Sequence, residues 1–249
     1  MVFMKDNFSK VSEQYAKLRP LHPKEIFEYL NSVVVAHEVA WDCATGSGQV
    51  ARELAPHFKK VMATDISEQQ IHHAYRSENI HYSVAPAEQT SFPENYFDLI
   101  TVGQAIHWFD FNAFYSEVKR TAKPHALLAV FGYGLNQVDD DTDKVIHHFY
   151  EDVLKGFWDP ERRYIDEKYQ TIPFPFKEIK TPQFNLRLDW SPEHFFGYLG
   201  TWSAVQHYKD RYQSDPVDEI KTDLLKTWKS DQIKTVTFPV MMRVGIVEK

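Results

Sequence analysis

Two glycines and an acidic residue near the start of the chain have the spacing of a nucleotide-binding site. The apolar segment 38–43 leads into Gly46 and Gly48, and a helix pattern over 49–58 follows directly. Glycine lets a ligand approach the main chain closely, and the N-terminus of the next helix presents free N–H groups. The next apolar segment ends at Asp65, whose carboxylate can accept hydrogen bonds from both hydroxyls of a ribose. We therefore expect a strand, a glycine turn and a helix that together bind a nucleotide.

The elements that must position this site alternate along the first half of the chain. Strand patterns fall at 38–43, 60–65, 80–85, 97–103 and 126–132, and helix patterns at 24–32, 49–58, 67–76 and 110–122. Such alternation predicts a Rossmann-like, doubly wound α/β sheet. Aromatic-rich helices, a strand at 184–190 and a last strand at 234–248 follow. We expect seven strands, five parallel plus a C-terminal antiparallel hairpin, with a helical cap.

The domain organisation follows from the same change of pattern. We expect one domain over residues 1–249, without internal repeats. Within it, an N-terminal arm and helix occupy 1–32, a cap insertion occupies 135–187, and C-terminal helices with the last strand occupy 188–249. The high aromatic content, 15% of all residues, predicts a cap that suits a ligand with an apolar or planar part.

Composition excludes several classes of protein. The net charge of -7 argues against a nucleic-acid partner. The longest apolar runs, such as 126–131, are too short to cross a membrane, and residues 1–10 lack the apolar core of a signal peptide. Cys43 is the one cysteine, so no internal disulfide forms. We expect a cytoplasmic protein; monomer and dimer both remain open.

Two matches favour a dinucleotide instead. Residues 46–51 fit the G-x-G-x-x-A fingerprint. Tyr164 and Lys168 have the Tyr-x-x-x-Lys spacing of short-chain dehydrogenases. Those enzymes also carry a G-x-x-x-G-x-G loop, and here Val50 and Arg52 stand where its later glycines would fall. A dinucleotide-dependent oxidoreductase is therefore the less favoured alternative.

A series of motifs resembles the class I S-adenosylmethionine (SAM)-dependent methyltransferases, specifically the methyltransferase type 11 group that includes trans-aconitate methyltransferase-like enzymes. Residues 42–48, DCATGSG, are similar to that family's D-x-G-x-G-x-G loop, with Ala44 in place of the first glycine. Further similar segments follow in the family's order, namely ATDIS at 63–67, APAEQTSFP at 85–93, FDLI at 97–100, QAIHWF at 104–109 and VKRTAKP at 118–124. The resemblance implies SAM as cofactor and methyl transfer to a small molecule as activity.

The resemblance and the strand ends together define an expected cofactor site. In it Asp65 binds the ribose, Asp42 orients the loop and reaches the methionyl ammonium, and Glu88 or its backbone meets the adenine. The full set of expected cofactor-binding residues is Tyr15, Arg19, Asp42, Ala44, Gly46, Gly48, Asp65, Ile66, Ala87, Glu88, Gln104, His107 and Trp108.

His107 is also the one candidate catalytic residue. An unperturbed imidazole titrates near neutral pH and suits a general base for a hydroxyl acceptor. A carboxylate acceptor needs no base, because alignment of the reacting atoms supplies most of the rate. We expect an oxygen acceptor of one of these two kinds. The alternative outside enzymology is a SAM-binding protein without turnover.

No metal site is expected. The adjacent histidine pairs at 72–73 and 147–148 diverge on a helix, and the twelve histidines show no ligand spacing. The sequence therefore does not favour a metal-dependent methyltransferase.

Overall fold

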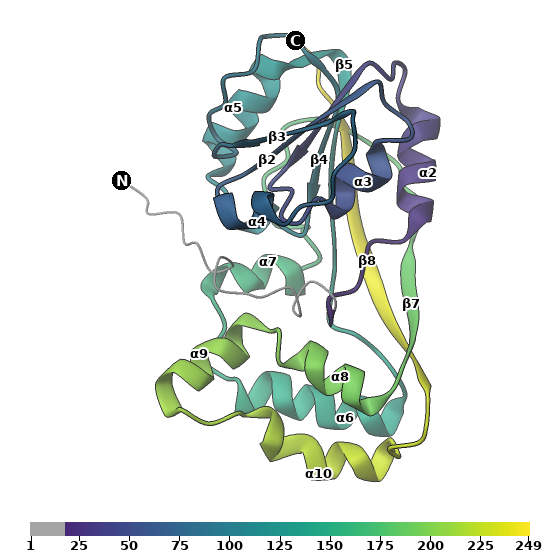
Figure 1. Cartoon of the computed structure of the whole chain (residues 1–249), viewed down its shortest axis with the longest axis vertical. Helices are drawn as coiled ribbons and strands as arrows, with labels where there is room; N and C mark the ends of the chain where they lie inside the picture. Colours follow the sequence, from purple (N-terminus) through teal and green to yellow (C-terminus); the bar gives the residue numbers. More distant parts are fainter. Residues whose placement is uncertain (1–17) are drawn as a thin grey trace.

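The computed structural model describes residues 18–249 and is built on one eight-stranded sheet (Figure 1). The strand order is β3-β2-β1-β4-β5-β8-β6, and β7 also pairs with β8. The strands are β1 (Val39–Cys43), β2 (Lys60–Asp65), β3 (Ile80–Val84), β4 (Phe97–Gly103), β5 (Ala122–Tyr133), β6 (Lys177–Ile179), β7 (Asn185–Trp190) and β8 (Lys234–Ile246). Strands β1 to β5 are parallel and β8 runs antiparallel to β5, which confirms the expected fold class.

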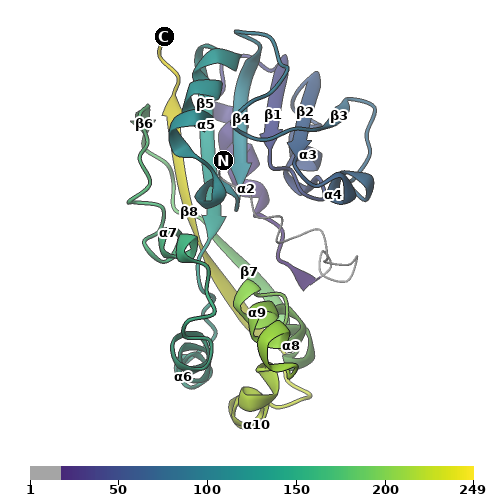
Figure 2. The same ribbon diagram turned by 90° about the vertical axis from the view of Figure 1, so that its left-hand side faces the viewer.

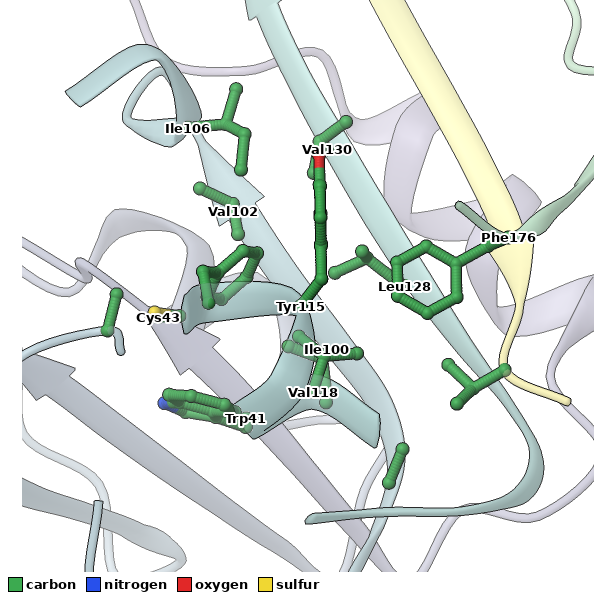
Figure 3. Close-up of a cluster of buried hydrophobic side chains, with 14 of the residues drawn as sticks. Trp41, Cys43, Ile100, Val102, Ile106, Tyr115, Val118, Leu128, Val130 and Phe176 are labelled. Carbon is green, nitrogen blue, oxygen red and sulfur yellow. The ribbon is translucent and has the colours of Figure 1, made fainter. Parts of the chain in front are cut away.

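Helices cover both faces of the parallel strands, as Figure 2 shows. They are α2 (Lys24–Val33), α3 (Gln49–Leu54), α4 (Glu68–His72) and α5 (Phe111–Thr121). Side chains of a strand alternate between faces: Leu99 joins the cluster under α2 and α3, whereas Ile100 joins the cluster under α5. Figure 3 shows the second cluster, where Tyr115 and Val118 of α5 point at the sheet. The central strands are therefore buried on both faces and largely apolar.

The edge of the sheet differs from the expected hairpin in its details. One edge of β8 pairs with β5 at 240–246, and its other edge pairs with β7 at 234–239 and with β6 at 244–246. Two short strands thus share one edge position, which gives eight strands in seven positions. Three helices separate β7 from β8, so the two strands are neighbours without forming a tight hairpin.

The cap stands beyond the carboxyl ends of β4 and β5 (Figure 1). Its helical segments are α6 (Asp140–His148), the π-helix η2 (Phe149–Val153), α8 (Pro192–Leu199), α9 (Ser203–Tyr212) and α10 (Val217–Thr227). The cap therefore draws on both of the expected segments, 135–187 and 188–249. The remaining short helices are η1 (Ile106–Trp108), η3 (Pro160–Arg162) and α7 (Arg163–Asp166). Cap and sheet share β8, whose first half packs among the cap residues.

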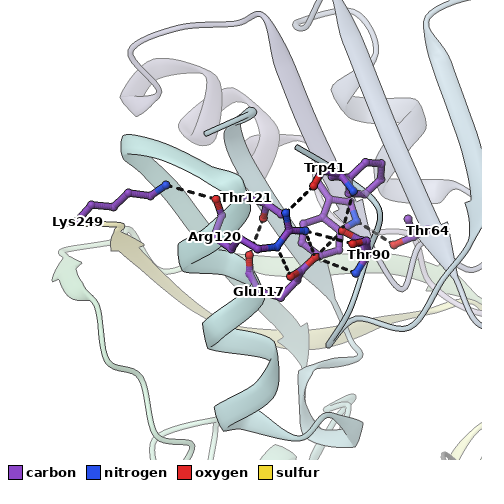
Figure 4. Close-up of polar contacts among 8 residues, drawn as sticks. Trp41, Thr64, Thr90, Glu117, Arg120, Thr121 and Lys249 are labelled. Atoms are coloured by element: carbon purple, nitrogen blue, oxygen red, sulfur yellow. Dashed lines mark hydrogen bonds and ion pairs between the residues drawn. The ribbon is translucent and has the colours of Figure 1, made fainter. Parts of the chain in front are cut away.

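An ion pair between the buried Glu117 and the half-buried Arg120 fastens the loop after β3 to α5 (Figure 4). Glu117 accepts hydrogen bonds from the Thr90 N–H at 2.8 Å and from the Arg120 Nη2 at 2.6 Å. Arg120 also donates to the Phe92 carbonyl at 2.6 Å. Burial by itself would raise the pKa of Glu117, but the hydrogen bonds from Arg120 and Thr90 outweigh it and lower the pKa. The network fixes residues 90–92 to the last turn of α5, beside the amino ends of β4 and β5.

Glu117→Gln should lower the free energy of unfolding by about 1–3 kcal/mol at neutral pH, because the buried charge-assisted bonds are weakened. A depressed carboxyl pKa stabilises the fold above the unfolded-state pKa and loses that effect as pH falls through the folded-state value. The difference between wild type and variant should therefore shrink in acid. Urea titrations across pH measure it, with the exposed Glu94→Gln as control. A difference that is equal at all pH values would contradict the assignment.

Candidate functional site

The carboxylate of Asp42, at the carboxyl end of β1, is the polar centre of the glycine turn. It is 1% exposed. Its Oδ2 accepts from the Thr45 hydroxyl at 2.5 Å and from the Ala51 N–H at 2.9 Å, and its Oδ1 accepts from the Thr101 hydroxyl at 3.3 Å. Burial raises the pKa of Asp42 to about 7, and these hydrogen bonds act against that shift. Asp42 thus joins the turn, α3 and β4 from beneath.

The turn itself runs through left-handed backbone at three expected positions. Ala44 has φ +56°, Gly46 has φ +54° and Gly48 has φ +78°. No atom lies within 4 Å of the point where a Cβ on Gly46 would stand, so the space beside it is open. A Cβ on Gly48 would collide with the Tyr82 hydroxyl. Gly46 therefore leaves room beside the turn, whereas Gly48 also has a packing role that the sequence did not reveal.

Asp65 at the end of β2 connects the turn to the next helix. Its Oδ2 accepts the Gly46 N–H at 2.8 Å, and its Oδ1 accepts the Ser67 N–H at 2.9 Å. Ser67 in turn caps α4 by accepting the Gln70 N–H at 3.3 Å. The neighbouring Ile66 is an exposed large apolar side chain. A carboxylate and an exposed apolar surface thus adjoin the open side of the turn.

The 85–88 segment follows β3 at the same edge. Ala87 is buried in the core cluster under α5. Glu88 is half-buried, and its Oε1 accepts the N–H of Asp110, the N-cap of α5, at 3.1 Å. The Glu88 side chain thereby fixes the start of α5, and the backbone of this segment borders the edge of the sheet.

Gln104 follows β4 in an unusual conformation for a residue with a side chain, with φ +55°. Its amide oxygen accepts the Tyr133 N–H at 2.8 Å, and its Nε2 donates to the Tyr133 carbonyl at 3.3 Å. Its own N–H donates to the Phe131 carbonyl at 2.7 Å. These bonds join the carboxyl ends of β4 and β5, so Gln104 lies at the strand ends where ligands of α/β sheets bind.

His107 lies on η1, directly after β4, and is 5% exposed. Its Nδ1 lies 3.3 Å from the Tyr169 Oη, and its ring centroid lies 4.9 Å from that of the half-buried Trp108. Burial, and secondarily the charge of Arg162, lower the pKa of His107 to about 3. The imidazole is consequently neutral and a weak base at physiological pH.

The N-terminal segment reaches the cap. Arg19 donates from Nη2 to the Thr201 carbonyl at 2.8 Å. Tyr15, the other expected residue of this arm, lies outside residues 18–249.

Sequence reasoning missed two site residues, Arg162 and Tyr169. They follow no motif, and Tyr169 meets His107 across 62 positions of sequence.

Residues 18–249 contain neither a metal-binding cluster nor a membrane-spanning helix. They hold no group of three or more His, Cys, Asp or Glu side chains arranged to bind a metal ion. Across the same residues, every helix is too short or too polar to cross a bilayer.

Comparison with known proteins identifies the family. Residues 41–130 match the methyltransferase domain family. A Dictyostelium discoideum protein bearing the name of a methyltransferase is 34% identical over 95% of this chain and 93% of its own length. A solved structure from Anaeromyxobacter dehalogenans, described as a type II methyltransferase, superposes with a TM-score of 0.86 at 39% identity over 92% of this chain and 98% of its own.

These matches remove the oxidoreductase alternative and leave the trans-aconitate-like subtype a prediction. The glycine turn follows β1, the acid follows β2, and the relatives span almost the whole length of the chain. The chain therefore belongs to the class I methyltransferases, and SAM is its cofactor.

Proposed function

We propose that this chain transfers the methyl group of SAM to a carboxylate oxygen of a small-molecule acceptor bound between the cap and the carboxyl ends of β4 and β5. The observation that carries the proposal is the chemistry of His107. In the part of the chain that the structure describes, the fold places two imidazoles, His107 and His22, at the ends of β4 and β5. Burial lowers the pKa of His107 to about 3 and that of His22 to about 4, so neither can serve as an effective general base. A hydroxyl acceptor must lose a proton, whereas a carboxylate enters already ionised.

The charge around His107 supports the same choice. Arg162 lies within electrostatic reach of both His107 and Tyr169: its positive charge adds to the lowering of the His107 pKa by burial, and it opposes the larger rise that burial causes in the Tyr169 pKa. Burial raises the pKa of Tyr169, so its phenol stays neutral and can donate a hydrogen bond. A guanidinium beside a neutral imidazole favours an anionic acceptor over an ammonium.

The aromatic rings of the cap suit an acceptor that is partly apolar or planar. Trp158 and Trp202 have ring centroids 5.5 Å apart, and Tyr150 lies 4.5 Å from Trp158. Arg162 lies over the Trp158 ring, with 4.8 Å between the guanidinium carbon and the ring centroid. We infer that the half-buried Trp158 ring and the guanidinium over it offer a planar carboxylic acid an apolar contact and a positive charge.

The residues present fit the cofactor. The open space beside Gly46 admits a ligand against the backbone. We infer that Asp65 holds the ribose, that Ile66 covers the adenine and that Gln104 borders the methionyl part. When bound, SAM supplies an electrophilic methyl group on a sulfonium. The protein aligns the acceptor oxygen with that methyl group and excludes water.

A screen of acceptor pools tests the proposal. Pools of carboxylic acids, phenols, quinols and amines are incubated with SAM and the full chain, and S-adenosylhomocysteine is measured. Turnover should be concentrated in the carboxylic acids. Turnover only with phenols or amines would overturn the carboxylate assignment, and cofactor binding without turnover in any pool would favour a binding protein.

Asp65→Ala should weaken S-adenosylhomocysteine binding by about 2–4 kcal/mol, because one or two charge-assisted hydrogen bonds are lost. Titration calorimetry measures the affinity, and Asp65→Asn, which keeps an acceptor oxygen, should lose less. Because Asp65 also holds the Gly46 N–H, circular dichroism must show an intact fold. An unchanged affinity would mean that Asp65 does not bind the ribose.

His107→Asn should lower kcat less than tenfold. The kcat profile of the wild type should show no limb near the ordinary histidine pKa, because the His107 pKa lies near 3. Initial rates between about pH 5 and pH 9 decide the matter. A larger loss, combined with a wild-type limb that the variant lacks, would identify a base and a hydroxyl acceptor.

A further inference from the structure

Tyr169 brings a buried phenol to His107 through strained backbone. The side chain is fully buried, and its Oη lies 3.3 Å from the His107 Nδ1. Lys168 and Tyr169 are consecutive residues in the left-handed region, with φ +53° and +61°. Side chains other than glycine rarely adopt this region, and such strain persists where the surroundings enforce it, often at functional sites.

The turn that carries Tyr169 is fixed to the sheet side of the molecule. The Nη1 of Arg243, in β8, donates to the carbonyls of Tyr169 at 3.0 Å and Ile172 at 2.7 Å. The hydroxyl of Tyr115, in α5, donates to the Pro173 carbonyl at 2.5 Å. Strand β8 and helix α5 thus both hold the turn, so the phenol of Tyr169 has a defined position.

A glycine in β5 makes the room for this phenol. A Cβ on Gly132 would stand 2.9 Å from the Tyr169 Oη and 2.4 Å from the Gln104 Oε1. A side chain at this position would therefore force the Tyr169 phenol and the Gln104 amide to move. Tyr169 therefore reaches the same strand ends as Gln104.

The direction of the hydrogen bond follows from accounting for each proton. A neutral imidazole has one N–H donor and one acceptor nitrogen. Among the described residues, the Tyr169 hydroxyl has the His107 Nδ1 as its hydrogen-bond partner. If Nδ1 carried the proton, the buried phenol O–H would lack an acceptor, which is costly. Tyr169 therefore donates to Nδ1, and the proton of His107 resides on Nε2.

We propose that Tyr169 is a positioning residue that fixes His107 in the Nε2–H form, so that His107 donates a hydrogen bond to the carboxylate of the acceptor. The inference rests on the proposed function for the identity of the acceptor. No proton moves, because the carboxylate enters ionised and its methyl ester leaves neutral. Arg162 is the charged group that faces His107, and Trp108 and Tyr169 are its ring neighbours.

Nuclear magnetic resonance of the full chain labelled with ¹⁵N-histidine tests the tautomer directly. Long-range ¹H–¹⁵N spectra distinguish a bare from a protonated ring nitrogen, and the His107→Asn spectrum identifies the signals. Wild type should show a bare Nδ1 and a protonated Nε2 that do not titrate between about pH 5 and pH 9. In Tyr169→Phe, the Nδ1–H form should appear. A wild-type Nδ1–H form, or a tautomer unchanged in Tyr169→Phe, would overturn the proposal.

Tyr115→Phe is the matched control, because it also deletes a hydroxyl that holds the same turn but does not contact His107. It should leave the tautomer as in wild type, and both variants should bind S-adenosylhomocysteine within about twofold of wild type. If the two variants alter the His107 signals alike, Tyr169 is only a structural residue.

A pair of substitutions tests the donor role. The substrates are the carboxylic acids that the screen identifies as acceptors. The amide nitrogen of His107→Gln stands near the Nε2 position, so this variant should retain several-fold more kcat/KM than His107→Asn. Equal losses would contradict donation from Nε2. The tautomer measurement needs no acceptor, so it still tests the role of Tyr169 if the acceptor is not a carboxylate. If the chain methylates carboxylates but His107 carries its proton on Nδ1, the proposed function stands and only the inference about Tyr169 is refuted.

Discussion

The buried carboxylate of Asp42 is the constraint on which the site depends. A carboxylate taken out of water is stable only when its oxygens are hydrogen-bonded. The donors that satisfy it come from Thr45 in the turn, Ala51 at the start of α3 and Thr101 in β4. One side chain thus sets the turn relative to the helix and to the neighbouring strand. Through the Gly46 N–H, the same turn is joined to Asp65, so the ends of β1, β2 and β4 form one polar unit.

The second half of the site depends on the shared strand β8. Its C-terminal half pairs with β5 and its N-terminal half packs in the cap, so cap and sheet are parts of one hydrogen-bonded framework. Arg243 on this strand holds the turn of Tyr169, and Tyr169 contacts His107. The chemistry at the end of β4 is consequently set by residues distant in sequence. In this environment His107 stays neutral, which favours an acceptor that carries its own negative charge.

Sequence reasoning predicted what local patterns encode. The five parallel strands were predictable because strand patterns alternate with helix patterns, even though only the first residue of β3 is buried. The position of Asp65 after the second strand follows from the same order. The division of the edge position between β6 and β7 was not predictable, since β6 spans only Lys177–Ile179 and has no periodicity of its own. The partnership of Tyr169 with His107 was equally hidden, because it depends on left-handed backbone and on a missing Cβ at Gly132. The low pKa of His107 was also not predictable, because it results from burial of the side chain and no motif in the sequence reveals that burial.

The chemical form of the product tests the central claim most directly. The full chain is incubated with SAM carrying a deuterated methyl group and with the acceptor pools, and the labelled products are treated with mild alkali. A methyl ester is cleaved and releases labelled methanol, whereas methyl ethers, methylamines and carbon-methylated products survive. We predict that the label is released. Labelled products that resist alkali would contradict the account.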